Sequence, residues 1–225
     1  MLQVLFRDEA LLAVQKPPGR IVIPGRGAPE PTLLDDAQAE HGKLWVVHRL
    51  DRGTSGVLLF ARTAAAHRAV NLAFDRQEVH KRYLALVRGP LPDALRVEAP
   101  LVPGRKGRVR VAGPGDPRAR QAATRLRVLE RFARAEVTAL VEAEPETGRT
   151  HQIRVHLAHA GAPLAVDPDY GPRSPLRDQA GAVLLERTPL HAAALSLRHP
   201  VGGAALAIEA PLPEDLLRVL SWARG

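Results

Sequence analysis

The sequence predicts an α+β fold with many short strands and few helices. Short apolar runs recur along the chain, and Pro and Gly, which number 20 and 18, separate them. Helix signals, in which a capping residue precedes a run of helix-forming residues, occur at only a few places. No apolar run approaches the roughly 18 residues of a membrane span, so we expect no contact with a membrane. The chain has no Cys, which excludes disulfides, thiolate metal sites and cysteine nucleophiles.

The first elements are predicted from turn residues and caps. Residues 11–14 and 21–23 are apolar enough for two strands, and Lys16-Pro17-Pro18-Gly19 forms a turn after the first strand. Thr32 is a candidate N-cap for a helix that Gly42 ends.

The next stretch begins polar and ends apolar. Asp51 lies close to two arginines, and a polar turn follows it, in which Gly53 and Gly56 bracket Thr54-Ser55. Residues 57–61 then form a buried strand, and Thr63 caps a second helix over 64–74. A charged loop that leads into a buried strand holds Asp51 at the edge of the core, which suits a reactive group. The alternative is a carboxylate that only forms a salt bridge and caps a turn.

The second half of the chain also predicts strands. Residues 79–87 have the length and composition of a strand, and alternation places Lys81, Tyr83, Ala85 and Val87 on one face. Residues 105–110 indicate an exposed basic hairpin or loop. Further strands are expected over 123–130, over 137–143 and after 190.

Two helices complete the expected fold. Thr150 is the candidate cap of a helix that Gly161 ends. A terminal helix over 213–222 has Leu216, Leu217 and Leu220 on its apolar side.

Positive charge is concentrated in one part of the chain. The formal net charge is +8, and residues 81–134 hold 14 Lys or Arg against 4 acidic residues. Such a block favours a polyanionic partner, most simply nucleic acid. A biased genome could raise the Arg content everywhere, but it would not confine the excess to one segment. No helix-turn-helix or zinc-finger pattern indicates DNA.

Three histidines raise the alternative of a metal site. His151, His156 and His159 are poorly spaced for one, and the acidic partner typical of a zinc helix is missing. We therefore predict no metal.

Three motifs resemble the RluA class of pseudouridine synthases. The first comprises His48-Arg49-Leu50-Asp51, Thr54-Ser55-Gly56 and Ala61, and the second is Lys81-x-Tyr83-x-Ala85-x-Val87-x-Gly89. The third runs over residues 147–156. The resemblance extends from about residue 11 to residue 211. One departure is Val166, because relatives usually have glycine at that position.

The resemblance implies a mixed, largely antiparallel sheet with flanking helices and a central RNA-binding cleft between two halves. It also implies isomerisation of uridine to pseudouridine in RNA without a cofactor. Asp51 would be the catalytic carboxylate, Arg154 would pair with it and keep it ionised, and Tyr83 would stack on the target base. The expected RNA-binding residues are Arg49, which would fill the space of the flipped base, and the phosphate-contacting Lys81, Arg105, Lys106 and Arg108.

These expectations extend to the whole chain. We predict one catalytic domain over 1–225 with two sub-halves, a monomer, no N-terminal accessory RNA-binding domain and a cytoplasmic location. The substrate, transfer RNA or ribosomal RNA, stays open. The competing hypothesis is a catalytically silent RNA-binding or ribosome-assembly protein on the same fold.

Overall fold

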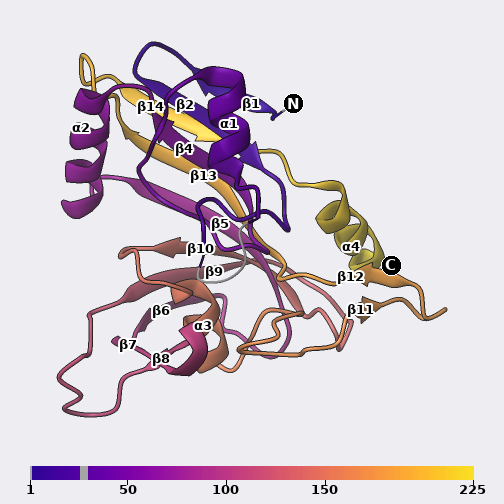
Figure 1. The fold of residues 1–225 in the computed structure, drawn as a ribbon. Coiled ribbons are helices and arrows are strands. Elements are labelled where there is room, and N and C mark those ends of the chain that lie inside the picture. The colour runs from indigo at the N-terminus through magenta and orange to yellow at the C-terminus, as the bar shows by residue number, and fades with distance from the viewer. Residues whose placement is uncertain (1, 26–29) are drawn as a thin grey trace. The chain divides into compact units, whose positions relative to one another are not determined.

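The computed structural model of the protein describes residues 2–25 and 30–225, except for the side chain of Lys106. The chain forms two compact units. Unit 1 comprises Met1–Lys81 and His191–Leu212, and unit 2 comprises Arg82–Leu190 and Pro213–Gly225. Each unit is described by itself below, with the element labels of Figure 1.

Unit 1 is a mixed sheet with two helices. Its strands follow the order β1-β2-β4-β13, with β3 paired to β4 and β14 paired to β13. The β4–β13 pairing is parallel and the others are antiparallel. The strands are β1 (Val4–Arg7), β2 (Leu11–Lys16), β3 (Trp45–Val46), β4 (Ser55–Ala61), β13 (Leu190–Arg198) and β14 (Ala205–Glu209), and the helices are α1 (Leu33–His41) and α2 (Ala64–Asp75).

The core of unit 1 is built around β4. Every residue of β4 is buried, as expected for a central strand that lies between two neighbours. Helix α2 packs against β3 and β4 and buries Ala66 and Val70, and Figure 1 shows it on the same side of the unit as β4. Asp51 therefore lies just before a strand that is buried along its whole length.

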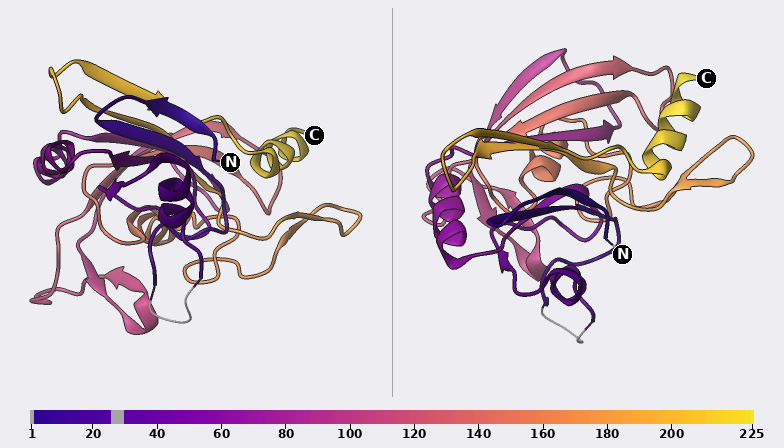
Figure 2. Two further views of the ribbon diagram at one scale, coloured as in Figure 1. Left: turned by 45° about the horizontal axis from the view of Figure 1, so that its top comes forward. Right: turned by 90° about the horizontal axis from the view of Figure 1, so that it is seen from above.

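Unit 2 is an antiparallel sheet with two short hairpins and two helices. Its main strands follow the order β5-β10-β9-β6. The β11–β12 hairpin, drawn orange, projects from the rest of this unit in both views of Figure 2. The strands are β5 (His80–Val87), β6 (Ala94–Glu98), β7 (Leu101–Pro103), β8 (Val109–Val111), β9 (Ala123–Arg131), β10 (Ala139–Pro145), β11 (Leu176–Arg177) and β12 (Val183–Leu185). The two helices are α3 (Gln152–His159) and α4 (Glu214–Arg224), and a single 3₁₀ turn, η1 (Arg105–Gly107), joins β7 to β8.

The predicted α+β class with a mixed, largely antiparallel sheet is confirmed. The predicted caps of the first two helices are also confirmed. Thr32 forms a capping box with Asp35, and the Thr63 side chain accepts from the backbone N–H of Ala66. None of the helices formed by residues 2–25 and 30–225 is long and apolar enough to cross a membrane.

The predicted strand over residues 21–23 is wrong. This segment is irregular, because its backbone carbonyls serve the start of α1 instead of a sheet. Ile21 O accepts from Leu33 N at 2.8 Å, and Val22 O accepts from Leu34 N at 3.2 Å. The first N–H groups of a helix have no partner within the helix, so an apolar segment that supplies carbonyls satisfies them.

Two details of the predicted helices are also corrected. Helix α3 has His151, not Thr150, at its N-cap, while Gly161 lies just past its end with φ 81°, as expected for a terminating glycine. Helix α4 buries Val219 in place of Leu217, which is 50% exposed.

Candidate active site

Asp51 lies on a tight turn that leads into β4. The backbone N–H of Thr54 donates to Asp51 O at 3.0 Å and closes the turn. Asp51 is partly exposed, between the buried Leu50 and the buried Thr54. Strand β4 begins at Ser55, so the expectation that Ser55 and Gly56 belong to the turn is wrong. Asp51 therefore begins a turn that is shorter than the sequence suggested and that leads directly into β4.

The side chain of Lys16 binds the backbone of this turn. Its side chain is completely buried, and Nζ donates to three backbone carbonyls. The acceptors are Pro17 O at 2.9 Å, Arg52 O at 3.1 Å and Thr54 O at 2.8 Å. Two of these carbonyls belong to the turn that follows Asp51. Burying an ammonium group costs free energy unless it is hydrogen-bonded, so Lys16 and the turn stabilise each other.

The start of β4 is fixed from the other side by β13. Ser55 Oγ lies 2.9 Å from Nδ1 of the fully buried His191, whose Nε2 lies 3.2 Å from Ala210 O. Because Nε2 must donate to this carbonyl, Nδ1 accepts from Ser55. Gly56 has φ 117° and lies so close to Ala192 that a Cβ would collide with its backbone oxygen. Ser55 and Gly56 of this motif are thus fitted to the parallel pairing of β4 with β13 next to Asp51.

His48 is a structural residue of the same motif. Its Nε2 accepts from the backbone N–H of Leu59 at 3.0 Å, and its ring lies 5.5 Å from that of Phe74. Burial, together with the positive charge of Lys81, lowers the pKa of His48 to about 3. The imidazole is therefore neutral, with its proton on Nδ1, and it ties the segment before Asp51 to β4.

In unit 2, Arg154 is the centre of a buried ion-pair network. Its Nε donates to Asp167 Oδ2 at 2.8 Å and its Nη2 donates to Asp167 Oδ1 at 2.7 Å. The same Nη2 donates to Asp169 Oδ2 at 2.9 Å. Arg154 is 5% exposed and Asp167 is completely buried. This bidentate geometry fixes the plane of the guanidinium.

The loop that carries these aspartates also contacts the β7–β8 hairpin. Asp169 accepts from Arg108 Nε at 2.9 Å, and the Tyr170 hydroxyl accepts from Val109 N at 2.8 Å. Burial raises the pKa of Asp169, but hydrogen bonds from Arg154 and Arg108 outweigh it, so the pKa lies below its ordinary value. Asp169 is therefore a charged bridge between two arginines.

Two residues of the third motif anchor α3 to the sheet. Gln152 Nε2 donates to Ala123 O at 2.9 Å, and His156 is hydrogen-bonded through both ring nitrogens. Its Nδ1 lies 2.8 Å from Thr124 Oγ1 and its Nε2 lies 3.0 Å from Ala99 O. His156 is completely buried and has a structural role. Within residues 2–25 and 30–225, no cluster of three or more possible metal-ligating side chains occurs.

The other predicted site residues lie on the expected elements. Tyr83 is half-buried on β5 and packs against the same apolar cluster as Ala85 and Val87, so the predicted alternation is correct. Lys81 is partly buried, and burial lowers its pKa. Arg49 is exposed.

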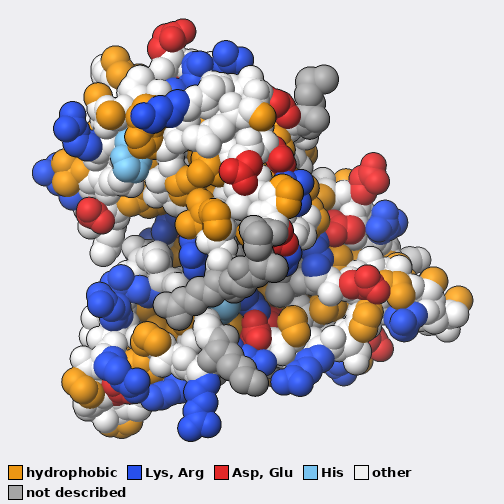
Figure 3. Space-filling view, viewed as in Figure 1, with side chains coloured by type: hydrophobic (Ala, Val, Ile, Leu, Met, Phe, Trp, Pro, Cys, Tyr) orange, Lys and Arg blue, Asp and Glu red, His pale blue; other side chains and the backbone are white. Residues whose placement is uncertain are grey.

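The basic hairpin is exposed in unit 2. The side chains of Arg105 and Arg108 are accessible, while that of Lys106 lies outside the described residues. Figure 3 shows Lys and Arg side chains gathered at the lower edge of the face, where Figure 1 draws β7 and β8. The predicted exposed basic hairpin is thus present.

The structure distributes the predicted residues over both units. Asp51, Arg49 and Lys81 belong to unit 1. Tyr83, Arg154, Arg105 and Arg108 belong to unit 2. The pairing of Asp51 with Arg154 stays a prediction, as does the cleft between the two halves.

Four residues of these networks were not predicted as site residues. Lys16 and Asp167 are completely buried ionic side chains, which apolar patterning cannot reveal. Asp169 and Tyr170 follow in the loop after Asp167. The available signal was the density of polar residues after the third motif, where two aspartates and the second of only two tyrosines stand together.

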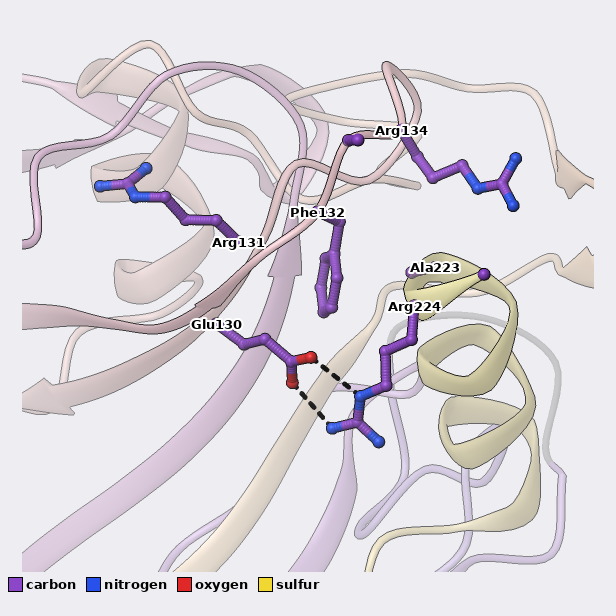
Figure 4. A pocket seen from close by; sticks show the side chains of 8 residues that line it. Glu130, Arg131, Phe132, Arg134, Ala223 and Arg224 are labelled. Atoms are coloured by element: carbon purple, nitrogen blue, oxygen red, sulfur yellow. Dashed lines mark hydrogen bonds and ion pairs between the residues drawn. The ribbon is translucent and has the colours of Figure 1, made fainter.

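A separate open hollow of about 380 Å³ lies at the ends of β9 and α4 in unit 2 (Figure 4). Phe132 points toward it, and Glu130 accepts from Arg224 Nε at 2.9 Å and from Nη2 at 2.7 Å. The side chains that line it include none of the predicted site residues. Its lining is Glu130, Arg131, Phe132, Ala133, Arg134, Ala223, Arg224 and Gly225.

Comparison with known proteins supplies the family. The model of the family described as RNA pseudouridylate synthase matches residues 10–159. The chain is 41% identical to ribosomal large subunit pseudouridine synthase D of Xanthomonas campestris, with 99% of this chain and 70% of that protein covered. It is 42% identical to ribosomal large subunit pseudouridine synthase C of Escherichia coli K12, with the same coverage.

A solved structure agrees with this similarity. The human protein named RNA pseudouridylate synthase domain containing 4 is 27% identical and superimposes with a TM-score of 0.78. The match covers 98% of this chain and 92% of the human chain.

Proposed function

The chain belongs to the RNA pseudouridylate synthase family, and from this premise we propose that it modifies large-subunit ribosomal RNA with Asp51 as the catalytic carboxylate. The protein is an RNA pseudouridine synthase, an isomerase. The names of the bacterial relatives, synthases C and D of the large ribosomal subunit, support this substrate. Transfer RNA is the alternative substrate. The non-catalytic RNA-binding hypothesis is not favoured.

The single observation that best supports a catalytic role for Asp51 is the rigidity of its turn. Lys16 holds two carbonyls that follow Asp51, and Ser55 and Gly56 are fixed against β13. A reacting group is most effective when its backbone is held in place before the substrate arrives. This turn meets that requirement, whereas a merely solvated carboxylate would need no such support.

The chemistry is balanced without an oxidant or a cofactor. The bond between N1 of uracil and C1′ of the sugar breaks, and a bond between C5 and C1′ forms. C5 loses a proton to solvent, and N1 ends with a proton. An ionised aspartate can act in such a reaction as a nucleophile or as a general base.

The remaining roles follow the family resemblance. Arg154 pairs with Asp51, while Asp167 and Asp169 accept from its Nε and Nη2 and fix the plane of its guanidinium. Tyr83 stacks on the target base and takes part in proton removal. A uridine must leave its stack to reach these groups, and Arg49 fills the space that it leaves.

RNA is held by its phosphates. Lys81 and the hairpin residues Arg105, Lys106 and Arg108 are the proposed contacts, because cations grip phosphate oxygens and set the register of the RNA. We further propose that the chain acts as one catalytic domain and as a monomer. A cytoplasmic location would accompany a ribosomal RNA substrate.

The proposal is tested by tritium release from RNA labelled at C5 of uridine. Large-subunit ribosomal RNA transcripts and total transfer RNA are assayed separately, with Asp51→Asn as the control. We expect release from the ribosomal transcripts by the wild-type protein alone. Release from transfer RNA only would contradict ribosomal RNA as the substrate. Full activity of Asp51→Asn would contradict the catalytic role of Asp51.

A further inference from the structure

We propose that Asp169 and Tyr170 are positioning residues that couple the docking of the β7–β8 hairpin to the orientation of Arg154. The inference rests on the proposed function, in which the hairpin grips RNA and Arg154 serves the catalytic centre. All contacts that carry it lie within unit 2. Neither residue needs to touch RNA for this role.

Asp169 connects the two arginines directly. One of its oxygens, Oδ2, accepts from Arg154 Nη2 at 2.9 Å, and the other, Oδ1, accepts from Arg108 Nε at 2.9 Å. The Arg154 side chain is 6% exposed, whereas that of Arg108 is 45% exposed. One carboxylate is thus shared by a buried guanidinium on α3 and an accessible guanidinium on the basic hairpin. A phosphate that attracts Arg108 competes with Asp169 for the same cation.

Tyr170 makes a second and independent connection. Its hydroxyl accepts from Val109 N at 2.8 Å and lies 2.8 Å from His151 Nδ1. A phenol can accept from a backbone N–H and donate to an imidazole nitrogen at once. The guanidinium of Arg154 lies 5.0 Å from the centre of the Tyr170 ring, within cation–π range. The same side chain therefore touches the hairpin, the start of α3 and Arg154.

The backbone at the start of α3 needs this support. His151 has φ 55° and ψ 16°, a left-handed conformation that is unfavourable for a residue with a side chain. Such a conformation persists only where the surroundings impose it, and it is typical of functional sites. The hydrogen bond from Tyr170 fixes the His151 ring, and Arg154 lies three residues further along the same helix.

These connections give the hairpin influence over Arg154. If the hairpin moves, Asp169 loses Arg108 and Tyr170 loses Val109 in the same event. Asp169 and Tyr170 keep their contacts with Arg154 and His151, but their own side chains are then less firmly fixed. A change in the hairpin should therefore alter the rate of the chemical step, beyond its effect on RNA affinity.

The first test is Tyr170→Phe, which keeps the ring beside Arg154 and removes both hydroxyl contacts. We expect hydrogen–deuterium exchange over residues 105–111 to accelerate in the free protein. We also expect the single-turnover rate at saturating RNA to fall about tenfold, because Arg154 is then held less firmly in its working orientation. The matched control is Glu130→Gln, because Glu130 on β9 also binds an arginine of unit 2, Arg224 on α4, which is not part of the hairpin. It should leave the saturated rate unchanged.

The second test is a double-mutant cycle between Arg108→Gln and Asp169→Asn. Coupling predicts that Arg108→Gln slows the saturated rate in the wild-type background but not in Asp169→Asn. Additive effects on the rate, or an unchanged exchange rate in Tyr170→Phe, would overturn the inference. The exchange measurement needs no activity, so it can fail or succeed separately from the proposed function. Loss of tritium release from every RNA would instead overturn the function.

Discussion

Lys16 Nζ donates to Thr54 O at 2.8 Å, with the lysine side chain completely buried. The two residues are 38 positions apart, and the N–H of the same Thr54 closes the turn that carries Asp51. The cation therefore binds backbone carbonyls of the turn and so fixes the position of Asp51, the proposed catalytic carboxylate. The ammonium group of Lys16 thereby supports the proposed site without taking part in the reaction.

Replacing Lys16 with Met tests this support. The substitution keeps the length of the side chain and leaves three carbonyl groups without their donor. We expect a loss of about 2–4 kcal/mol in the free energy of unfolding, measured by urea denaturation. Catalytic rate should fall as well, because the turn that carries Asp51 loses its anchor. The matched control is Lys43→Met, since Lys43 is exposed and contacts only the face of Trp45 among the described contacts. A Lys16 variant as stable and active as this control would contradict the role of Lys16.

Asp51→Asn should abolish turnover while RNA affinity stays within a few-fold of the wild-type value. The change is nearly isosteric, so the turn closed by Thr54 N should persist. Tritium release and a filter-binding titration measure the two quantities on the same RNA. Asp35→Asn, which alters the cap of α1, serves as a carboxylate control with retained activity. Equal loss of affinity and rate would indicate a general binding role for Asp51.

Arg154→Met should destabilise the protein strongly, because it leaves the buried carboxylate of Asp167 without its cation. Breaking one side of a buried pair typically costs about 3–5 kcal/mol. The double variant Arg154→Met with Asp167→Leu removes both charges, and its unfolding free energy should recover most of the loss. Activity should remain low in both variants if Arg154 serves catalysis. Recovery of activity together with stability would reduce Arg154 to a structural residue.

The stability of the protein should depend on pH through His48. Its pKa is lowered from 6.5 to about 3 by burial and by Lys81, so the folded state disfavours the protonated ring. The resulting stability is fully present above pH 6.5. It should fall by up to about 1.4 kcal/mol per pH unit as the pH drops from 6.5 toward 3.

His48→Gln keeps an acceptor for Leu59 N and removes the titration, so its stability should change less over this range. The pKa of His156 is lowered as well, chiefly by burial, so part of the dependence should remain. His80→Gln, at an exposed position, is the control. Urea unfolding at several pH values measures the slopes. Identical slopes for the wild type and His48→Gln would contradict the prediction.

Neutralising Arg105, Lys106 and Arg108 together should flatten the salt dependence of RNA binding. Each lost phosphate contact lowers the slope of log K against log salt by roughly 0.7–0.9, so three contacts account for about 2–3. A matched triple change at the exposed residues Arg7, Arg68 and Arg218 controls for total charge. An unaltered slope in the hairpin variant would place the phosphate grip elsewhere.

Local signals in the sequence were sufficient where local physics decides the structure. The Thr32 cap, the Thr63 cap and the buried strand after Asp51 depend on a few adjacent residues, and each prediction was correct. The alternation over residues 79–87 also placed Tyr83 and Val87 in one cluster. These features need no knowledge of distant contacts.

Distant partners explain what the sequence did not reveal. Residues 21–23 have the composition of a strand, but their carbonyls are used by α1. Asp167 and Lys16 resemble ordinary loop and strand-end charges until the fold buries them with their partners. A left-handed His151 cannot be read from a Thr-His-Gln sequence, because a hydrogen bond from Tyr170 supports it.

Ser55 and its partner His191 are separated by 136 residues, and this separation has a consequence for biosynthesis. A ribosome adds roughly 5–20 residues per second, so β13 follows β4 out of the ribosome after a delay on the order of 10 s. During that delay a nascent chain carries Asp51 without the strand against which Gly56 closes. Strands β13 and β14 are the last to join the sheet of unit 1, so the turn that carries Asp51 gains its full support only after they are made. The order of synthesis therefore delays the assembly of the proposed site around Asp51.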